Sequence, residues 1–215
     1  MKERTPSDIS VVEAHYFPPV SVFGLMHQWD VLLEYHETYQ KRTFRNKCMI
    51  ANAQGVQILT IPLKKGKHES QAITDVKISY DEPWQARHLA AIRTAYGSAA
   101  FFEEYIEEIT KMVCNHESNL LAFTTSTIQE ICELLDVRCF IGTTSSYLST
   151  DHYHADFRDR ITPRSDEIDL PDYAQVFGEN YSFVSNLSIL DLLFCMGPSS
   201  KLYLSSLPGL SRIIL

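Results

Sequence analysis

Four cationic side chains and two aromatic side chains fall within nine residues, from Tyr39 to Lys47, of an otherwise acidic protein. The cations are Lys41, Arg42, Arg45 and Lys47. A positive group in a chain of formal charge -8 is a candidate site for phosphate, a sugar nucleotide or a carboxylate, with aromatic rings available for stacking. The alternative is that these cations pair with acids elsewhere in the fold. Only Glu34 and Glu37 lie close by in the sequence.

Two histidine groups could perform acid–base chemistry. His15 precedes Tyr16-Phe17-Pro18 at the end of an apolar run, where the rigid proline could aim the imidazole into a cleft as a general base. The alternative for His15, and for His27 further along the chain, is a packed, hydrogen-bonded side chain.

The second histidine group lies on an expected helix. Trp84 and His88 are neighbours at i, i+4, and Arg87 lies next to His88 in the sequence. Tyr96 lies further along the same side of the helix. This face is either the wall of a pocket with His88 as its polar group or the boundary of a core helix.

Two further patterns are weaker. His152, His154 and Asp156 project to one side if the chain is extended, as in a site of two histidines and one carboxylate that binds a metal.

The hydroxyls of Thr143 to Ser146 could donate to an oxyanion or a sugar, but neither serine lies in a G-x-S-x-G elbow. Walker and G-x-G-x-x-G phosphate loops are also absent from the sequence, so we expect no bound metal and no cofactor.

The bulk properties limit the class of protein. A chain of 215 residues with 45% hydrophobic residues can bury the core of one large domain, residues 1–215. Its acidity argues against nucleic-acid binding, and no apolar run is long enough for a membrane span or a secretory signal. The five scattered cysteines form no C-x-x-C pair, which favours a reducing compartment, and we expect a cytoplasmic protein.

The elements that must position these residues are predicted as α/β, with a mixed sheet, a β-α-β start, a hairpin and a central group of helices. We expect strands at 9–17 and 31–35 around a helix at 20–29, which places His15 at the carboxyl end of the first strand, where ligands bind in open α/β sheets. Residues 48–51 and 56–63 read as a hairpin, 73–80 as a strand and 139–141 as another.

Helices are expected from about residue 83 to 96, through the stripe from Phe102 to Val113, through a stripe from Leu121 to Leu135, and from Ser188 to Met196. The polar segment 149–180 has no periodicity, so we expect an irregular or flexible insertion there.

Five segments, taken in chain order, resemble the WbqC-like family of bacterial proteins. They are His15-Tyr16-Phe17-Pro18, residues 41–46, Leu59-Thr60-Ile61-Pro62, Trp84 with His88 and Tyr96, and residues 187–194. Phe44 stands where the family motif has Trp, and Lys47 where it ends in Arg.

This resemblance implies a role in making surface polysaccharides of the O-antigen type, because the genes of the family lie among those for such glycans. It implies a transferase that modifies a nucleotide-linked amino sugar by acyl or aminoacyl transfer. The alternative is a non-catalytic module that binds a glycan precursor or a partner protein. For the transferase we predict His15 and His88 as catalytic residues. The predicted substrate-binding residues are Tyr16, Tyr39, Lys41, Arg42, Arg45, Asn46, Trp84 and Tyr96. The expected partner is a phosphorylated small molecule or a nucleotide sugar; the sequence leaves the oligomeric state open.

Overall fold

The computed structural model describes residues 9–66, 71–137, 141–163, 168–177 and 182–210. Four parallel strands form one sheet: β1 (Ile9–Glu13), β2 (Asp30–Glu34), β5 (Ile141–Thr143) and β6 (Ala155–Asp156). Their spatial order is β5-β2-β1-β6, and β1 pairs with β2 from Ile9 opposite Asp30 to Glu13 opposite Glu34. Four of the five β1 residues are buried, as expected of an inner strand of a parallel sheet.

The expected β-α-β start is confirmed. Helix α1 (Val20–Gln28) connects β1 to β2 and begins directly after Pro18-Pro19, whose rings end the preceding extended chain. The late segment 187–189 fixes the start of α1: Val20 N–H donates to the Leu187 carbonyl, and Ile189 N–H donates to the Pro18 carbonyl. The Ser188 hydroxyl donates to the carbonyl of Phe17, which lies 171 residues earlier in the chain.

The expected hairpin is also confirmed. β3 (Lys47–Asn52) and β4 (Gly55–Thr60) pair antiparallel, with Asn52 opposite Gly55 at the turn. Gly55 has a φ of 113°, a conformation that side-chain-bearing residues rarely adopt. The α/β class therefore holds, with the parallel and the antiparallel strands in two separate sheets.

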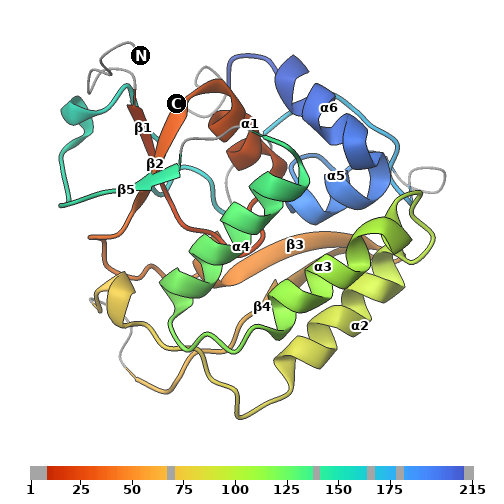
Figure 1. Ribbon diagram of the computed structural model, residues 1–215, viewed down its shortest axis with the longest axis horizontal. Coiled ribbons are helices and arrows are strands. Elements are labelled where there is room, and N and C mark those ends of the chain that lie inside the picture. Colours follow the sequence, from red (N-terminus) through yellow and green to blue (C-terminus); the bar gives the residue numbers. More distant parts are fainter. Residues whose placement is uncertain (1–8, 67–70, 138–140, 164–167, 178–181, 211–215) are drawn as a thin grey trace.

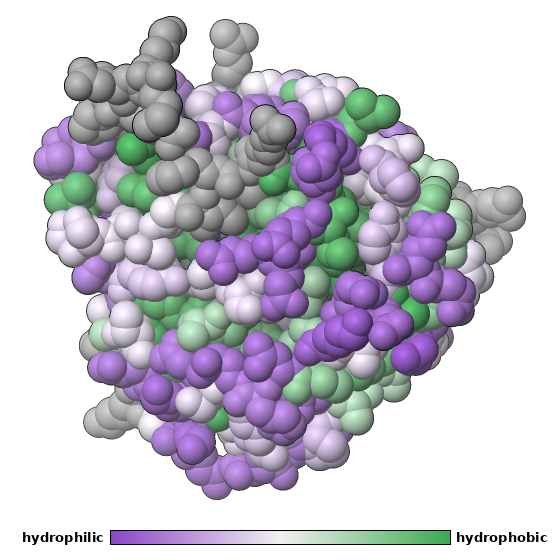
Figure 2. Space-filling model, viewed as in Figure 1, coloured by the Kyte–Doolittle hydropathy of each residue, from purple (hydrophilic) through white to green (hydrophobic). Residues whose placement is uncertain are grey.

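Helices α2 (Trp84–Tyr96) and α3 (Phe102–Cys114) lie side by side, and α4 (Leu120–Leu134) runs beside them (Figure 1). All three match the expected apolar stripes. Helix α5 (Ile189–Met196) packs against α1, α2 and α3, and α6 (Ser200–Ser206) follows it. Ser188 caps α5 through its hydroxyl, which accepts from the Leu190 N–H. The view in Figure 2 shows hydrophilic side chains over most of the lower half of this face.

One expectation about a strand is wrong. Residues 73–80 do not form a strand: Ile73–Asp75 is a 3-10 turn (η3), and Leu63–Ile78 and Lys77–Asn119 are isolated bridges. Within segment 149–180, the described residues include a 3-10 turn at Thr150–His152 (η4) and the edge strand β6. The apolar side chains of 73–80 are buried one by one in the core, but only isolated bridges, and no partner strand, pair with this segment in the described structure. Of the expected strand 139–141, residues 139 and 140 lie outside the described residues.

A test of this packing uses Gly197, which follows α5 with a φ of 52°. A Cβ on Gly197 would lie 2.4 Å from the Phe101 ring, so Gly197→Ala combines backbone strain with a clash. We expect this variant to lose ~1–3 kcal/mol of unfolding free energy in urea denaturation.

Gly209→Ala is the matched control, because nothing lies within 4 Å of an added Cβ there. Equal stability of the two variants would contradict this packing of Gly197 on Phe101.

Candidate functional site

The carboxyl edge of the parallel sheet is the place where the fold favours a ligand. Taken in chain order, the four strands follow the spatial order 3-2-1-4, so the order reverses between β1 and β6. In open α/β sheets ligands bind outside the carboxyl ends of the strands at such a reversal. β1 and β2 end in Glu13 and Glu34, and β6 ends in Asp156, so this edge carries acids.

Five ionisable residues meet at the reversal and are called here the switch-point cluster: Glu13, His15, Glu37, Arg45 and Asp159. Arg45 is completely buried at its centre. Its Nε donates to Glu37 Oε1 at 2.8 Å, and its Nη2 donates to the other oxygen of Glu37. Nη2 also donates to Asp159 Oδ1 at 2.9 Å, and Nη1 lies 3.6 Å from Glu13 Oε1.

His15 lies on the other side of Glu13. Its Nε2 is 3.1 Å from Glu13 Oε1, and both side chains are buried. In the described part of the chain neither ring nitrogen of His15, nor Nη1 of Arg45, makes a hydrogen bond of good geometry. Buried donors and acceptors without such bonds are costly, so the fold holds these three atoms at a cost in stability.

The cluster contains a group that exchanges a proton near neutral pH. Burial raises the pKa of Glu37 to about 7, and this effect outweighs the hydrogen bond and charge of Arg45. Glu13 shows the opposite result: burial acts to raise its pKa, but His15 and Arg45 together leave it below the ordinary value. Two carboxyls with pKa values pushed apart are typical of a site that moves protons.

A second ion-pair group lies next along the same edge. Arg158 donates from Nη1 to Glu34 Oε2 at 2.8 Å and from Nε to Asp156 Oδ1 at 2.9 Å, and its guanidinium lies 4.2 Å from the centre of the Tyr147 ring. The Thr144 hydroxyl donates to Glu34 at 2.6 Å. Thr144, one of the hydroxyls considered for an oxyanion or a sugar, is therefore occupied in holding this strand end.

The suggested metal set is not assembled. Asp156 is bound by Arg158, the His154 ring packs on Trp29 at 5.9 Å, and His152 Nδ1 lies 3.0 Å from the Ser149 hydroxyl. Within the described residues no three His, Cys, Asp or Glu side chains are arranged to hold a metal ion.

A cleft of about 860 Å³ adjoins the switch-point cluster, a volume in the range of small-molecule sites. Its lining combines aromatic and aliphatic residues with hydroxyls, an amide and two carboxylates: Phe44, Met49, Val56, Thr162, Pro163, Ile168, Asp169, Asp172, Ser182, Phe183, Val184, Ser185 and Asn186. Phe44 joins the two features, because its ring contacts the His15 ring with 5.7 Å between centroids. The Phe44 side chain thus stands between the cleft and the buried imidazole.

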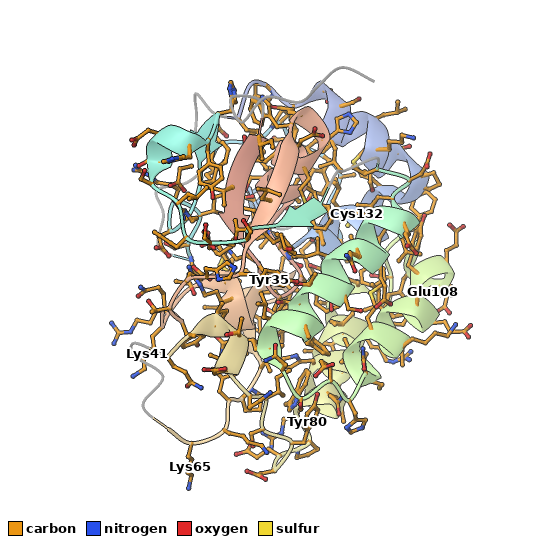
Figure 3. The ribbon with its side chains drawn as sticks, turned by 60° about the vertical axis from the view of Figure 1, so that its left-hand side comes forward. Tyr35, Lys41, Lys65, Tyr80, Glu108 and Cys132 are labelled. Carbon is orange, nitrogen blue, oxygen red and sulfur yellow. The ribbon has the colours of Figure 1, made fainter. Side chains whose placement is uncertain are left out.

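The expectation that the four cations of residues 39–47 gather in one recess is wrong. Arg45 is buried and bound by carboxylates of its own chain, whereas Lys41 and Arg42 are exposed and Lys47 is half-buried. The Lys41 side chain points away from the body of the protein (Figure 3). An acidic chain has enough carboxylates to neutralise an arginine through residues that are distant in the sequence. Here these residues are Glu13 and Asp159, and their distance from Arg45 in the sequence conceals the pairing.

Most of the remaining predicted site residues form the core behind this edge. Tyr16 and His88 are buried, and 3.0 Å separates the Tyr16 hydroxyl from His88 Nδ1. Burial lowers the pKa of His88 to about 4, so it is neutral at physiological pH. The ring of Trp84 packs on both Tyr16 and His88.

Tyr39, Asn46 and Tyr96 are also buried. Asn46 accepts from the Tyr39 hydroxyl at 3.1 Å and donates to the Ile61 carbonyl at 2.9 Å, which fixes the start of the hairpin. The Tyr96 ring packs on Phe194 in α5. Among the predicted site residues in the described chain, His15 and Arg45 alone belong to the switch-point cluster, and none lines the cleft.

Sequence reasoning missed Glu13 and Asp159, and it named Glu37 only as an acid near the cations. Glu13 had a usable signal, because a carboxylate ends an otherwise apolar strand. Asp159 had none, since it depends on β6 joining β1. Its own N–H donates to both oxygens of Glu13, at 3.3 and 3.2 Å, and places the loop after β6 over the cluster.

Replacing the central cation tests the cluster. Arg45→Met leaves Glu13 and Glu37 buried without their partner, and we expect a loss of ~3–5 kcal/mol in urea denaturation followed by circular dichroism. Arg87→Met is the control, because it breaks an exposed pair with Glu82 and should change stability by under ~1 kcal/mol. A loss for Arg45→Met no larger than that for Arg87→Met would refute the assignment.

Glu37 predicts a pH dependence of stability. Its folded pKa of about 7 lies above the value of 4.5 for a free side chain, so its contribution is fully present below pH 4.5 and is lost as the pH rises through 7. Between pH 5 and 8 we expect the unfolding free energy of wild type to fall by roughly 2–3 kcal/mol relative to Glu37→Gln, measured in parallel urea titrations. Parallel pH profiles of the two proteins would show that Glu37 does not titrate in this window.

Comparison with known proteins extends these observations. The model of the WbqC-like protein family matches residues 13–166, which begin at Glu13 of the switch-point cluster. The chain is 25% identical over 227 residues to the uncharacterized protein Rv1507c of Mycobacterium tuberculosis, covering 91% of this chain and 96% of that protein. No solved structure matches the chain. In the described part of the chain, no helix has the length and apolarity to cross a bilayer.

Proposed function

Because the chain belongs to the WbqC-like protein family, we propose that it is a cytoplasmic transferase of bacterial surface-polysaccharide synthesis, of the O-antigen type, that modifies a nucleotide-linked amino sugar. The observation that carries this proposal is a proton-exchanging cluster at the sheet reversal beside a cleft of substrate size. The family match supports the biological setting, and the cluster supports the chemistry.

The reaction is acyl or aminoacyl transfer from an activated acyl donor to the amine of the sugar. The amine nitrogen forms a bond to the acyl carbon, the bond from that carbon to the leaving group breaks, and the amine gives up one proton. A base must take this proton. His15, paired with Glu13, and Glu37, with its pKa of about 7, are the groups in the cluster suited to do so.

Arg45 has a different role from the phosphate contact expected of it. Its guanidinium holds the carboxylates in place, because Nε and Nη2 donate to Glu37 and Nη1 lies 3.6 Å from Glu13 Oε1. Phosphate binding falls to Lys41 and Arg42, which are exposed and lie three and two residues, respectively, before Phe44 of the cleft.

A non-catalytic module that binds a glycan precursor or a partner protein is the second candidate. It is favoured by one observation: His15 and His88 are both buried, and neither lines the cleft. For transfer to occur, the Phe44 ring must move to give the substrate access to His15.

Binding and transfer are tested together. We expect at least one member of a panel of UDP-, dTDP- and GDP-linked amino sugars to raise the melting temperature, and Arg42→Ala to reduce that shift by more than half. Lys65→Ala removes an exposed cation from another loop and should leave the shift unchanged. Absence of stabilisation by every member, or equal shifts in wild type and Arg42→Ala, would refute the nucleotide-sugar assignment.

Mass spectrometry of the nucleotide sugar after incubation with acyl thioesters then separates the two candidates. The transferase adds an acyl group, and His15→Gln abolishes the product while the thermal shift by the nucleotide sugar remains. Stabilisation by the sugar without any product across the donors, and unchanged by His15→Gln, identifies the binding module.

A further inference from the structure

Most of the cleft is built from two short stretches of chain, residues 168–177 and 182–186, which are called here the wall segments. They supply eight of its thirteen described lining side chains. The two are bonded to each other, because the Ser185 hydroxyl accepts from the Leu170 N–H at 3.0 Å and donates to the Ile168 carbonyl at 2.6 Å. A displacement of one wall segment therefore displaces the other.

The side chain of Gln175 joins the wall segments to α5. Its Oε1 accepts from the Val184 N–H and its Nε2 donates to the Val184 carbonyl, each at 2.9 Å. The same Nε2 donates to Asp191 Oδ2 at 2.8 Å, and the Tyr173 hydroxyl donates to that oxygen at 2.5 Å. One oxygen of Asp191 thus receives two bonds from the wall segments.

Asp191 is an unusual anchor for a loop. It is only 1% exposed, and the bonds to Oδ2 come from a hydroxyl and an amide rather than from a cation. Burial raises the pKa of Asp191, although the bonds from Tyr173 and Gln175 act to lower it. A buried carboxylate that loses its donors is costly, so the wall segments stay on α5 while these two bonds are made. The proposed reaction gives Asp191 no role.

We propose that Asp191 is the positioning residue of the cleft: its bonds to Tyr173 and Gln175 hold the wall segments on α5, and breaking these bonds opens the cleft while the core stays folded. The opening is local because the described residues of the wall segments form no helix or strand and are held by side-chain bonds at a few points. The inference concerns any ligand of the cleft and does not rest on the transfer reaction.

Cys195 reports on this opening. It lies four residues after Asp191 in α5, on the same side of the helix. Burial and the charge of Asp191 raise the pKa of its thiol to about 12, and a hydrogen bond with the backbone of Val176, in a wall segment, acts in the other direction. When the wall segments leave α5, the thiol loses this cover and meets solvent. Two other cysteines calibrate the signal: Cys48 is buried and reports unfolding of the core, and Cys114 is exposed.

Alkylation by iodoacetamide, followed at each cysteine by mass spectrometry of peptides from the full chain, tests the proposal. Tyr173→Phe removes one bond to Asp191 and leaves the carboxylate in place. We expect Cys195 to react at least about fivefold faster in this variant, with unchanged rates at Cys48 and Cys114. An unchanged rate at Cys195, or a rate at Cys48 that rises in parallel, would overturn the inference.

Tyr80→Phe is the matched control. It also removes a tyrosine hydroxyl, which donates to the Glu117 carbonyl at 2.6 Å between α3 and α4. Because this bond is not made to the wall segments or α5, we expect the rate at Cys195 to equal that of wild type.

Hydrogen exchange followed by mass spectrometry adds a test by rescue. Asp191→Ala removes both bonds and should speed exchange in the wall segments, where the Leu170 and Val184 N–H groups are bonded to side chains, by at least about tenfold. Asp191→Asn should stay within about twofold of wild type, because an amide oxygen in place of Oδ2 can accept both bonds. Equal exchange in the two variants would contradict the role of these bonds.

The outcome is separable from that of the nucleotide-sugar panel. A nucleotide sugar that raises the melting temperature should also slow alkylation of Cys195 in wild type, because a ligand in the cleft keeps the wall segments closed. Stabilisation with an unchanged rate at Cys195 leaves the proposed function standing and removes the inference. Faster alkylation in Tyr173→Phe, without stabilisation of wild type by any nucleotide sugar, does the reverse.

Discussion

The burial of Arg45 among carboxylates from three parts of the chain is the interaction on which the rest of the site depends. Glu13 comes from the end of β1, Glu37 from the loop after β2, and Asp159 from the loop after β6. A buried guanidinium is tolerated only when its donors are matched, and buried carboxylates are tolerated only beside such a cation. The ion pairs of Arg45 therefore tie the end of β1 to the loops after β2 and β6 at this edge of the sheet.

The excess of carboxyls over cations explains why one member of the cluster, Glu37, retains a proton near neutral pH. Arg45 bonds to Glu37 directly, but burial and the nearby charges of Glu13 and Asp159 act in the other direction. A single arginine cannot keep all these carboxyls ionised away from water. The resulting partly protonated state links two properties of the edge, its stability and its capacity to transfer a proton.

The sequence predicted the elements whose signals are local. α1 begins behind Pro18-Pro19, the hairpin turns at Gly55, and the stripes of α2, α3 and α4 bury the expected faces. It did not predict β6, a two-residue strand that has no pattern of its own and exists because Ser10 and Val11 offer a free edge. The same reason explains the error at the site. Arg45 belonged to the predicted group of cations, but Asp159, one of the acids that bind it, is brought to it by the pairing of β1 with β6, which a local motif cannot encode.

The bonds between residues 17–20 and 187–189 have a consequence for the order of folding. The N–H and carbonyl groups at the entry to α1 remain exposed until a segment made some 170 residues later reaches them. During synthesis on the ribosome the β1–α1–β2 unit is thus incomplete for most of the elongation time, with an apolar helix start unsealed. Contacts so distant in sequence form slowly, so the sealing of the start of α1 belongs to the late steps of folding.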